Sequence, residues 1–202
     1  MLSSPKIVLL VLTIASSLAL GACGEDEFEF QQSLSFNGLM NLDTAGFRAE
    51  AGDPAPFDEV APVVLPVDFK MSELSPELID YKERGLFRTM NFNSVRYTII
   101  ENTTTTDIEP MEVYLAPLGS TEINPDEGVL IATIPAISAG TTPTGEAEIL
   151  HANTSAASTL VFDLDFATVT GAEISLRAGD ETPTGKMRLQ VDMVMTIKAD
   201  PL

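Results

Sequence analysis

The residue types of a catalytic triad occur together in the last third of the chain. His151 is the only histidine among 202 residues, Ser155 and Ser158 follow it closely, and Asp163 and Asp165 come shortly after. A histidine can take the proton of a serine hydroxyl while a carboxylate orients the ring. However, neither serine lies in a Gly-x-Ser-x-Gly sequence, and geometry rather than residue type defines a triad. We therefore predict no catalytic residues, no cofactor and no enzymatic activity.

Asp163 and Asp165 could also form a carboxylate pair for general acid and base catalysis. They alternate with Phe162 and Leu164, a pattern typical of a strand whose two carboxylates are neighbours on the wet face. An acid and a base for hydrolysis must face a shared pocket from opposite sides. The pattern therefore favours a solvated strand surface over a hydrolytic site.

Oxygen-bearing side chains cluster in the segment Asn-Pro-Asp-Glu-Gly at 124–128, where Asn124, Asp126 and Glu127 are weak candidates for calcium ligands. The segment lacks the spacing and the distant bidentate glutamate of an EF-hand loop. Zinc would require nitrogen and sulfur ligands, and the chain has one histidine and one cysteine. We predict a solvated acidic turn and no metal site.

Cys23 is the only cysteine of the chain, and its position indicates modification rather than catalysis. A single cysteine cannot form an intramolecular disulfide. It follows a weakly basic lead at 1–6 and an uncharged, mostly apolar run at 7–20. That run is too short for a comfortable membrane span and is typical of the central region of a secretory signal. The sequence therefore predicts an exported protein.

The residues Leu20-Gly21-Ala22-Cys23 resemble the lipobox of bacterial lipoproteins. The resemblance implies that the peptide 1–22 is cleaved, that the Cys23 thiol carries diacylglycerol, and that the new amino terminus is also acylated, for example with palmitate. More than one acyl chain makes membrane anchoring stable. Gly24 is not the aspartate that retains enteric lipoproteins in the inner membrane, so we expect the outer membrane. The alternative is a plain signal peptide or an anchor helix, with an incidental cysteine.

The mature chain would be strongly acidic. Lys6 is removed with the signal peptide, so 10 of the 11 Lys and Arg residues face 30 Asp and Glu residues, a net charge of −20. Such a charge repels phosphate backbones, so nucleic acid is excluded as a partner. It also disfavours contact with anionic lipid, so the lipid anchor is the expected membrane contact. A protein partner at the surface or in the periplasm, and the oligomeric state, stay open.

Period-two alternation predicts strands along most of residues 28–202. The clearest segments are 28–36, followed by an Asn-Gly turn signal at 37–38, and 186–198, where six apolar residues share one face. A change of parity near Asn93 indicates a bulge. Prolines at 43–66 predict a long loop or an edge strand. One short surface helix is expected at 76–84, capped by Ser75 and stopped by Gly85.

Two further patterns concern turns and strands in the second half of the chain. Leu160, Phe162, Leu164 and Phe166 alternate, which predicts a strand. The tetrapeptide Thr-Pro-Thr-Gly occurs at 142–145 and again at 182–185. We interpret both copies as hairpin connections with the same turn chemistry.

These elements predict an all-β fold, an antiparallel two-sheet sandwich that is immunoglobulin-like or jelly-roll-like, with an up-and-down barrel as the alternative. Residues 28–202 would form one domain after a lipidated acidic tether at 23–27. The expected role is a non-catalytic binding or structural module, with loops at 43–66, 116–128 and 151–159 as places for recognition. The alternatives are a periplasmic carrier holding an apolar ligand between the sheets, and an enzyme with an unrecognised site around His151.

Overall fold

The computed structural model describes residues 28–202, and strands make up about half of them. The strands of this part are β1 (Phe28–Asn41), β2 (Glu59–Lys70), β3 (Phe87–Asn102), β4 (Met111–Pro117), β5 (Val129–Ile134), β6 (Thr144–Glu146), β7 (Glu148–Ile149), β8 (Asp165–Leu176) and β9 (Lys186–Ala199). The helices are η1 (Leu42–Thr44), α1 (Met71–Leu74), α2 (Glu77–Glu83), η2 (His151–Asn153) and α3 (Thr154–Phe162). Among these residues no helix is long and apolar enough to cross a bilayer.

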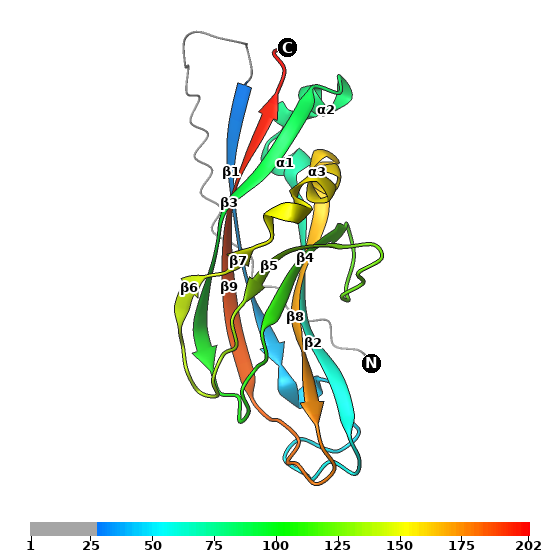
Figure 1. Ribbon diagram of the computed structural model, residues 1–202, viewed down its shortest axis with the longest axis vertical. Helices are drawn as coiled ribbons and strands as arrows, with labels where there is room; N and C mark the ends of the chain where they lie inside the picture. Colours follow the sequence, from blue (N-terminus) through cyan, green and yellow to red (C-terminus); the bar gives the residue numbers. More distant parts are fainter. Residues whose placement is uncertain (1–27) are drawn as a thin grey trace.

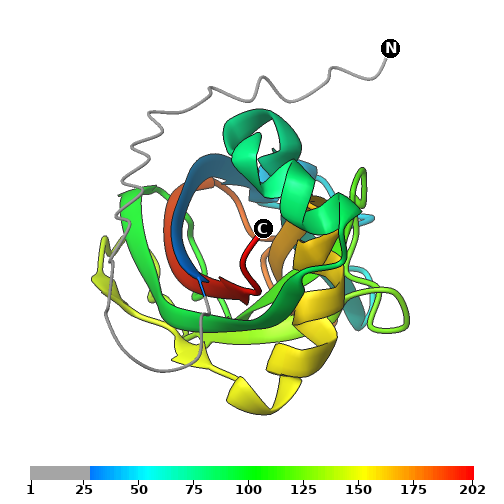
Figure 2. The same cartoon turned by 90° about the horizontal axis from the view of Figure 1, so that it is seen from above.

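The strands form two antiparallel sheets. Sheet I has the order β1-β9-β3-β6, and sheet II has the order β2-β8-β4-β5-β7. Figure 1 shows sheet I on the left, sheet II on the right, and α1, α2 and α3 together near the upper end. Seen from above, the strands curve around a shared interior (Figure 2). The predicted antiparallel two-sheet sandwich is confirmed.

Strand β9 forms the centre of sheet I. Its alternating apolar residues, from Met187 to Ile197, are all fully buried, because one face of the strand points between the sheets. β9 pairs with β1 along its whole length and with β3 on the other side. The register of β3 shifts between Phe92 and Ser94. The bulge expected near Asn93 is therefore confirmed.

Strand β1 is longer than its sequence suggests, and the turn expected at 37–38 is wrong. The strand continues through Gly38 to Asn41, and its pairing with β9 is uninterrupted. A side chain at Gly38 would collide with the Leu65 side chain of β2. The glycine therefore serves close contact between the two sheets rather than a change of direction.

The strand expected from Leu160 to Phe166 is also wrong, because helix α3 occupies 154–162. Ala157 and Val161, spaced as on one helical face, are fully buried. The chain then turns at Leu164, a non-glycine residue with a φ of 66°, before β8 begins. The alternation in the sequence therefore spans a helix end, a turn and a strand start.

The short helix expected at 76–84 is confirmed as α2, but its predicted cap is not. The Ser75 hydroxyl donates a hydrogen bond to the Gln32 side-chain oxygen at 3.1 Å instead of capping the helix. Both residues are buried, so this bond satisfies two polar groups where α2 meets β1. Gly85 follows the helix with a φ of 65°, as the predicted stop requires.

The proline-rich loop expected at 43–66 ends earlier, because β2 begins at Glu59. Pro62 and Pro66 lie within β2, and β2 is the edge of sheet II. Proline lacks an N–H donor and is tolerated where a strand has one hydrogen-bonded neighbour. The edge-strand alternative for these prolines is confirmed.

The two Thr-Pro-Thr-Gly copies have different conformations, so their interpretation as the same turn is wrong. In the first copy, Thr144 and Gly145 belong to β6, which pairs with Tyr97 and Thr98 of β3. In the second copy, Gly185 has a φ of 98° and directly precedes β9. The surrounding tertiary contacts, rather than the local sequence, decide the conformation of each copy.

Two threonine hydroxyls in β8 are buried without a hydrogen-bond partner among the described residues. Thr168 and Thr170 are fully buried and have the same parity as Phe166 in the core. A buried hydroxyl without a partner costs free energy. We therefore expect Thr168→Val and Thr170→Val each to raise the free energy of unfolding, by about 1 kcal/mol, in urea denaturation.

Thr104→Val provides a control of opposite sign for this prediction. Thr104 is also buried, but its hydroxyl donates to the Asn102 side-chain oxygen at 2.8 Å. Its replacement should destabilise the protein by about 1 kcal/mol. Destabilisation by all three valine variants would show that the β8 hydroxyls have partners.

Candidate binding groove

A groove with a volume of about 710 Å³ lies on the outer face of sheet II. Its lining comes from β2, β8, β4 and β5, from the end of the β3–β4 connection and from the β4–β5 loop. The lining residues are Pro62, Val64, Glu109, Pro110, Glu112, Tyr114, Glu122, Ile123, Pro125, Thr133, Gly171, Ala172, Glu173 and Ser175. The groove thus joins segments that are more than a hundred residues apart in the chain.

Four residues that are paired across neighbouring strands form the floor of the groove. Val64 pairs with Gly171, Gly171 with Glu112, and Glu112 with Thr133, so the four residues form one row across four strands. Gly171 contributes no side chain to this row, and the Val64 and Ile123 side chains cover it, because a Cβ atom there would lie 2.8 Å from the Val64 Cγ1 atom and 3.2 Å from the Ile123 Cδ1 atom. A Cβ atom there would lie 2.7 Å from the Val63 carbonyl oxygen. This close approach accounts for glycine at the position.

The β4–β5 loop folds back over the sheet and closes one end of the groove. The Gly119 N–H donates to the Asp68 carboxylate of β2 at 2.9 Å, which holds the start of the loop over the neighbouring strands. Near its end, the Gly128 N–H donates to the Asn124 carbonyl at 2.8 Å. Between these two points Ile123 lies above Gly171. The loop therefore has a defined shape that the sheet supports.

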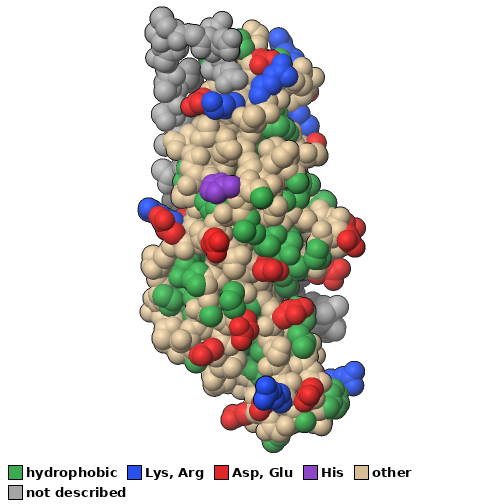
Figure 3. Space-filling view, viewed as in Figure 1, with side chains coloured by type: hydrophobic (Ala, Val, Ile, Leu, Met, Phe, Trp, Pro, Cys, Tyr) green, Lys and Arg blue, Asp and Glu red, His purple; other side chains and the backbone are tan. Residues whose placement is uncertain are grey.

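The groove is acidic, with apolar walls. Glu109, Glu112, Glu122 and Glu173 line it, and its lining contains no lysine or arginine. In Figure 3, acidic side chains lie among apolar ones over the middle of the visible face, whereas most visible Lys and Arg side chains lie near the two ends. Anionic ligands are therefore disfavoured in this groove.

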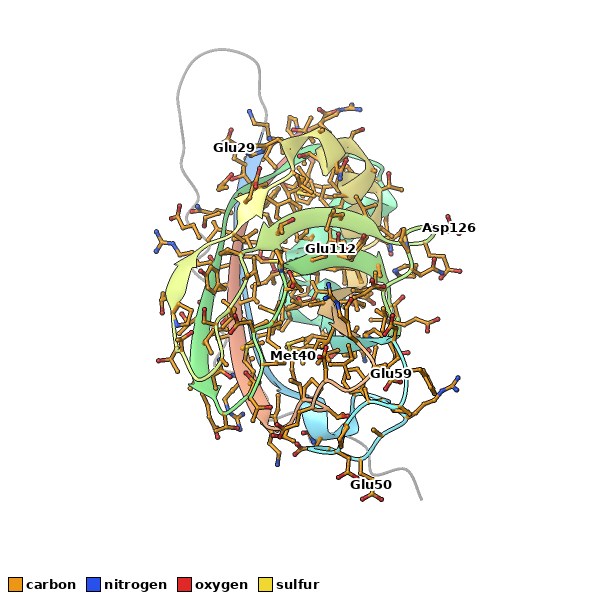
Figure 4. The ribbon with its side chains drawn as sticks, turned by 60° about the horizontal axis from the view of Figure 1, so that its bottom comes forward. Glu29, Met40, Glu50, Glu59, Glu112 and Asp126 are labelled. Carbon is orange, nitrogen blue, oxygen red and sulfur yellow. The ribbon has the colours of Figure 1, made fainter. Side chains whose placement is uncertain are left out.

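Tyr114 and Glu112 form a hydrogen-bonded pair of side chains within the lining. The Tyr114 hydroxyl donates to a Glu112 carboxylate oxygen at 3.2 Å. Burial raises the pKa of Tyr114 above its usual value, and the neighbouring Glu112 charge raises it further. The phenol therefore stays protonated at neutral pH and can hold Glu112 in place. Figure 4 labels Glu112 at the ribbons of sheet II.

No hydrogen bond within residues 28–202 joins His151 to either candidate serine or to either candidate aspartate. His151 is exposed in η2, and the Ser158 hydroxyl donates to the Thr154 carbonyl within α3. Asp163 lies 3.8 Å from the Lys82 ammonium group, whereas Asp165 accepts hydrogen bonds from Ser72. Asp163 and Asp165 are thus separated by the turn at Leu164, and the expectation that they are strand neighbours is wrong.

The calcium candidates lie at the β4–β5 loop without forming a metal centre. The Asn124 side-chain oxygen accepts a hydrogen bond from the Asp126 N–H at 3.1 Å, which uses it inside the turn. Asp126 and Glu127 are exposed, and Figure 4 shows Asp126 at the far side of the loop. Within residues 28–202, no three His, Cys, Asp or Glu side chains converge closely enough to hold a metal ion.

Cys23 and its neighbours at 20–27 lie outside the described residues, so the lipobox stays a prediction. Of the three loops expected to serve recognition, 116–128 contributes Glu122, Ile123 and Pro125 to the groove. Sequence reasoning missed Gly171, Glu112 and Tyr114. Their only signal was an outward position on strands, and that position does not reveal which strands are adjacent.

Comparisons with known proteins yield no family. No family model and no curated protein matches the chain. Similar solved structures include one of Desmodium yellow mottle tymovirus, with 13% identity over 100% of this chain and 98% of that chain and a TM-score of 0.24. One of turnip yellow mosaic virus has 12% identity over 95% of this chain and 92% of that chain and a TM-score of 0.29.

A third similar structure is described as belonging to carbohydrate-binding modules of the β-sandwich superfamily. It has 11% identity over 82% of this chain and 55% of that chain, with a TM-score of 0.28. Similarities this weak support no functional argument. The protein is therefore described by its own architecture, as a β-sandwich module with an acidic groove on the outer face of sheet II.

Proposed function

We propose that the protein is a lipid-anchored, non-catalytic binding module of the bacterial cell envelope, with the groove on sheet II as its ligand site. The groove is the observation that supports binding. It has a volume of about 710 Å³, within the size range of small-molecule sites. The sequence Leu20-Gly21-Ala22-Cys23 supports the lipid anchor and the localisation to the cell envelope.

The composition of the groove favours binding over catalysis. Its lining contains no histidine, cysteine or lysine, so a serine or cysteine nucleophile with an adjacent nitrogen base is not available there. The residues that sequence reasoning considered for a triad, His151 with Ser155 and Ser158, are not part of the lining. A reversible binding role requires none of these groups.

The carrier alternative required a cavity between the sheets. The space between them is filled by buried apolar side chains of β1, β3, β8 and β9, and the groove lies on the outer face of sheet II. No observation favours the carrier over the binding module.

A short tether would keep the module near the membrane. Residues 24–27 separate Cys23 from the first residue of β1, Phe28. A fully extended chain rises about 3.4 Å per residue, so this tether spans at most roughly 17 Å. The groove would then act on ligands close to the membrane surface.

The anchor is tested with Cys23→Ser in the producing bacterium. Wild-type protein should incorporate labelled palmitate and fractionate with the outer membrane, whereas Cys23→Ser should incorporate none and appear in soluble fractions. Gly24→Ala, which leaves the four lipobox residues unchanged, serves as the matched control and should behave as wild type. Membrane association of Cys23→Ser equal to wild type would contradict the proposal.

Protease treatment of intact cells then decides the orientation. Digestion of the anchored protein while a periplasmic marker survives would mean that the module faces outward. Protection until the outer membrane is opened would mean that its ligands are periplasmic.

A further inference from the structure

We propose that β1 is an interface between two copies of this chain. The two β1 strands pair antiparallel along their open edges and join the two copies of sheet I into one continuous sheet. The proposal combines the backbone groups that β1 presents, the protection of the other sheet edges and the charge around β1. It does not depend on the groove, which lies on the other sheet.

Strand β1 presents unpaired backbone groups along one side. Among residues 28–202 it has one strand neighbour, β9, and pairs with it over all 14 residues. Directly after β1, the Leu42 N–H donates to the Gly185 carbonyl at 3.0 Å in the same register. Because successive strand residues point their N–H and C=O groups to opposite sides, even-numbered residues face β9 and odd-numbered residues face away. The residues that face the open side are Glu29, Gln31, Ser33, Ser35, Asn37 and Leu39.

The other sheet edges in the described part of the chain carry features that oppose strand pairing. Edge strand β2 contains Pro62 and Pro66, which have no N–H to donate. Strands β6 and β7 have three and two residues. The register of β3 shifts twice before the part that pairs with β6, and the Phe87 ring lies 5.0 Å from the Phe162 ring of α3.

Strand β1 has none of these protective features. It contains no proline, and its register with β9 has no shift from Phe28 to Asn41. Figure 4 labels Glu29 and Met40, near the two ends of the strand. A long, regular edge without proline, bulge or charge is the kind of edge that pairs with another strand.

The charge around β1 selects a second copy as the partner. The chain has a net charge of −19, so two copies repel each other where their acidic surfaces meet. Residues 30–41 contain no charged side chain. Strands β1 and β9 together carry three basic and two acidic side chains, a net charge of +1, which are Lys186, Arg188, Lys198, Glu29 and Asp192. A cationic partner would be attracted to the acidic surfaces instead, whereas this nearly neutral edge lets a second acidic copy approach.

Antiparallel pairing of two β1 strands is self-complementary. A two-fold axis at Ser35, near the middle of the strand, places open-side residues of both copies opposite one another. Ser33 then lies opposite Asn37 of the second copy, and Gln31 lies opposite Leu39, whose side chain is 41% exposed in the single chain. Because each copy has one such edge, the assembly closes at two copies.

The first test is sedimentation of the full-length protein in density-matched non-ionic detergent over a range of protein concentrations. The wild-type protein should form a dimer that dissociates on dilution. Ser33→Pro removes an open-side N–H without removing a bond to β9 and should weaken dimerisation at least ten-fold. Val60→Pro is the matched control, because Val60 is exposed on β2 with the same parity as Pro62 and Pro66. It should change dimerisation less than two-fold, and equal losses for the two proline variants would overturn the proposal.

A second pair of variants changes side chains and leaves the backbone donors in place. Gln31→Glu/Ser33→Glu adds carboxylates from both copies to the interface and should weaken dimerisation at least ten-fold, because like charges on paired strands repel. Thr89→Glu/Asn91→Glu adds the same charge at exposed positions of β3 in the same sheet. It should change dimerisation less than two-fold. A larger effect of the β3 variant would contradict the proposal, because the interface would then lie at β3.

Amide hydrogen exchange identifies the backbone groups that pair. The open-side amides of Gln31 and Asn37 should be protected in the dimer and should exchange rapidly in Ser33→Pro. The Met40 amide faces β9 and should stay protected in both proteins. Rapid exchange of the open-side amides in a wild-type dimer would overturn the proposal, as would a wild-type protein that is monomeric at every concentration.

Discussion

Phe166→Ala is expected to lower the free energy of unfolding by about 3–5 kcal/mol, the usual cost of removing a large aromatic side chain from a core. Phe166 is fully buried at the start of β8. Its ring lies 5.6 Å from that of Phe69 in β2, which in turn lies 5.8 Å from Phe36 in β1. This row of rings connects the two sheets, so the cavity would form at their contact.

The measurement is urea denaturation followed by circular dichroism. Phe57→Ala is the matched control, because the Phe57 side chain is 40% exposed in the β1–β2 connection. Its loss should cost less than about 1 kcal/mol, as is usual for surface substitutions. Similar losses for both variants would mean that Phe166 does not join the sheets as described.

Gly185→Ala is expected to destabilise the protein by about 2–4 kcal/mol, from backbone strain and overpacking together. Gly185 has a φ of 98°, a conformation that side chains disfavour. A Cβ atom there would also collide with the backbone carbonyl of Thr103. The Gly185 N–H donates to Asp43, and its carbonyl accepts from Leu42, so the residue cannot move away without losing both bonds.

Gly140→Ala distinguishes the two contributions expected at Gly185, which are backbone strain and overpacking. Gly140 also has a positive φ, 67°, but a Cβ atom there would meet nothing within 4 Å. Its replacement should cost only the left-handed backbone penalty, about 1–2 kcal/mol. Equal losses at the two glycines, measured by the same denaturation, would show that the contact with Thr103 relaxes freely.

The sequence by itself determined the sandwich and most of its long strands. In β9, six alternating apolar residues predict the strand and its buried face, because each strand residue points opposite to the next. The bulge at Asn93, the helix stop at Gly85 and the edge position of Pro62 and Pro66 could likewise be predicted. Each of these depends on backbone chemistry within a few residues.

Predictions from the local sequence pattern were wrong where the conformation of a residue depends on contacts with residues that are distant in the sequence. Leu160 to Phe166 alternates, yet burial of Ala157 and Val161 against the core favours a helix up to Phe162. The sequence suggests that Gly38 and Gly185 are both turn residues. In the structure, Gly38 permits close contact with Leu65, and Gly185 permits close approach of the Thr103 backbone. Tertiary contacts therefore override local preference at these positions.

Only the tertiary structure decided the candidate site. The loop at 116–128 could be suggested from the sequence. The row across the sheet could not, because it depends on the strand order β2-β8-β4-β5 and on the register of these strands. The row consists of Val64, Gly171, Glu112 and Thr133. Alternation tells which face a residue occupies and carries no information about the neighbouring strand, because sheet hydrogen bonds join backbones that are far apart in sequence. The strands of this protein follow from local periodicity, and its groove follows from their pairing.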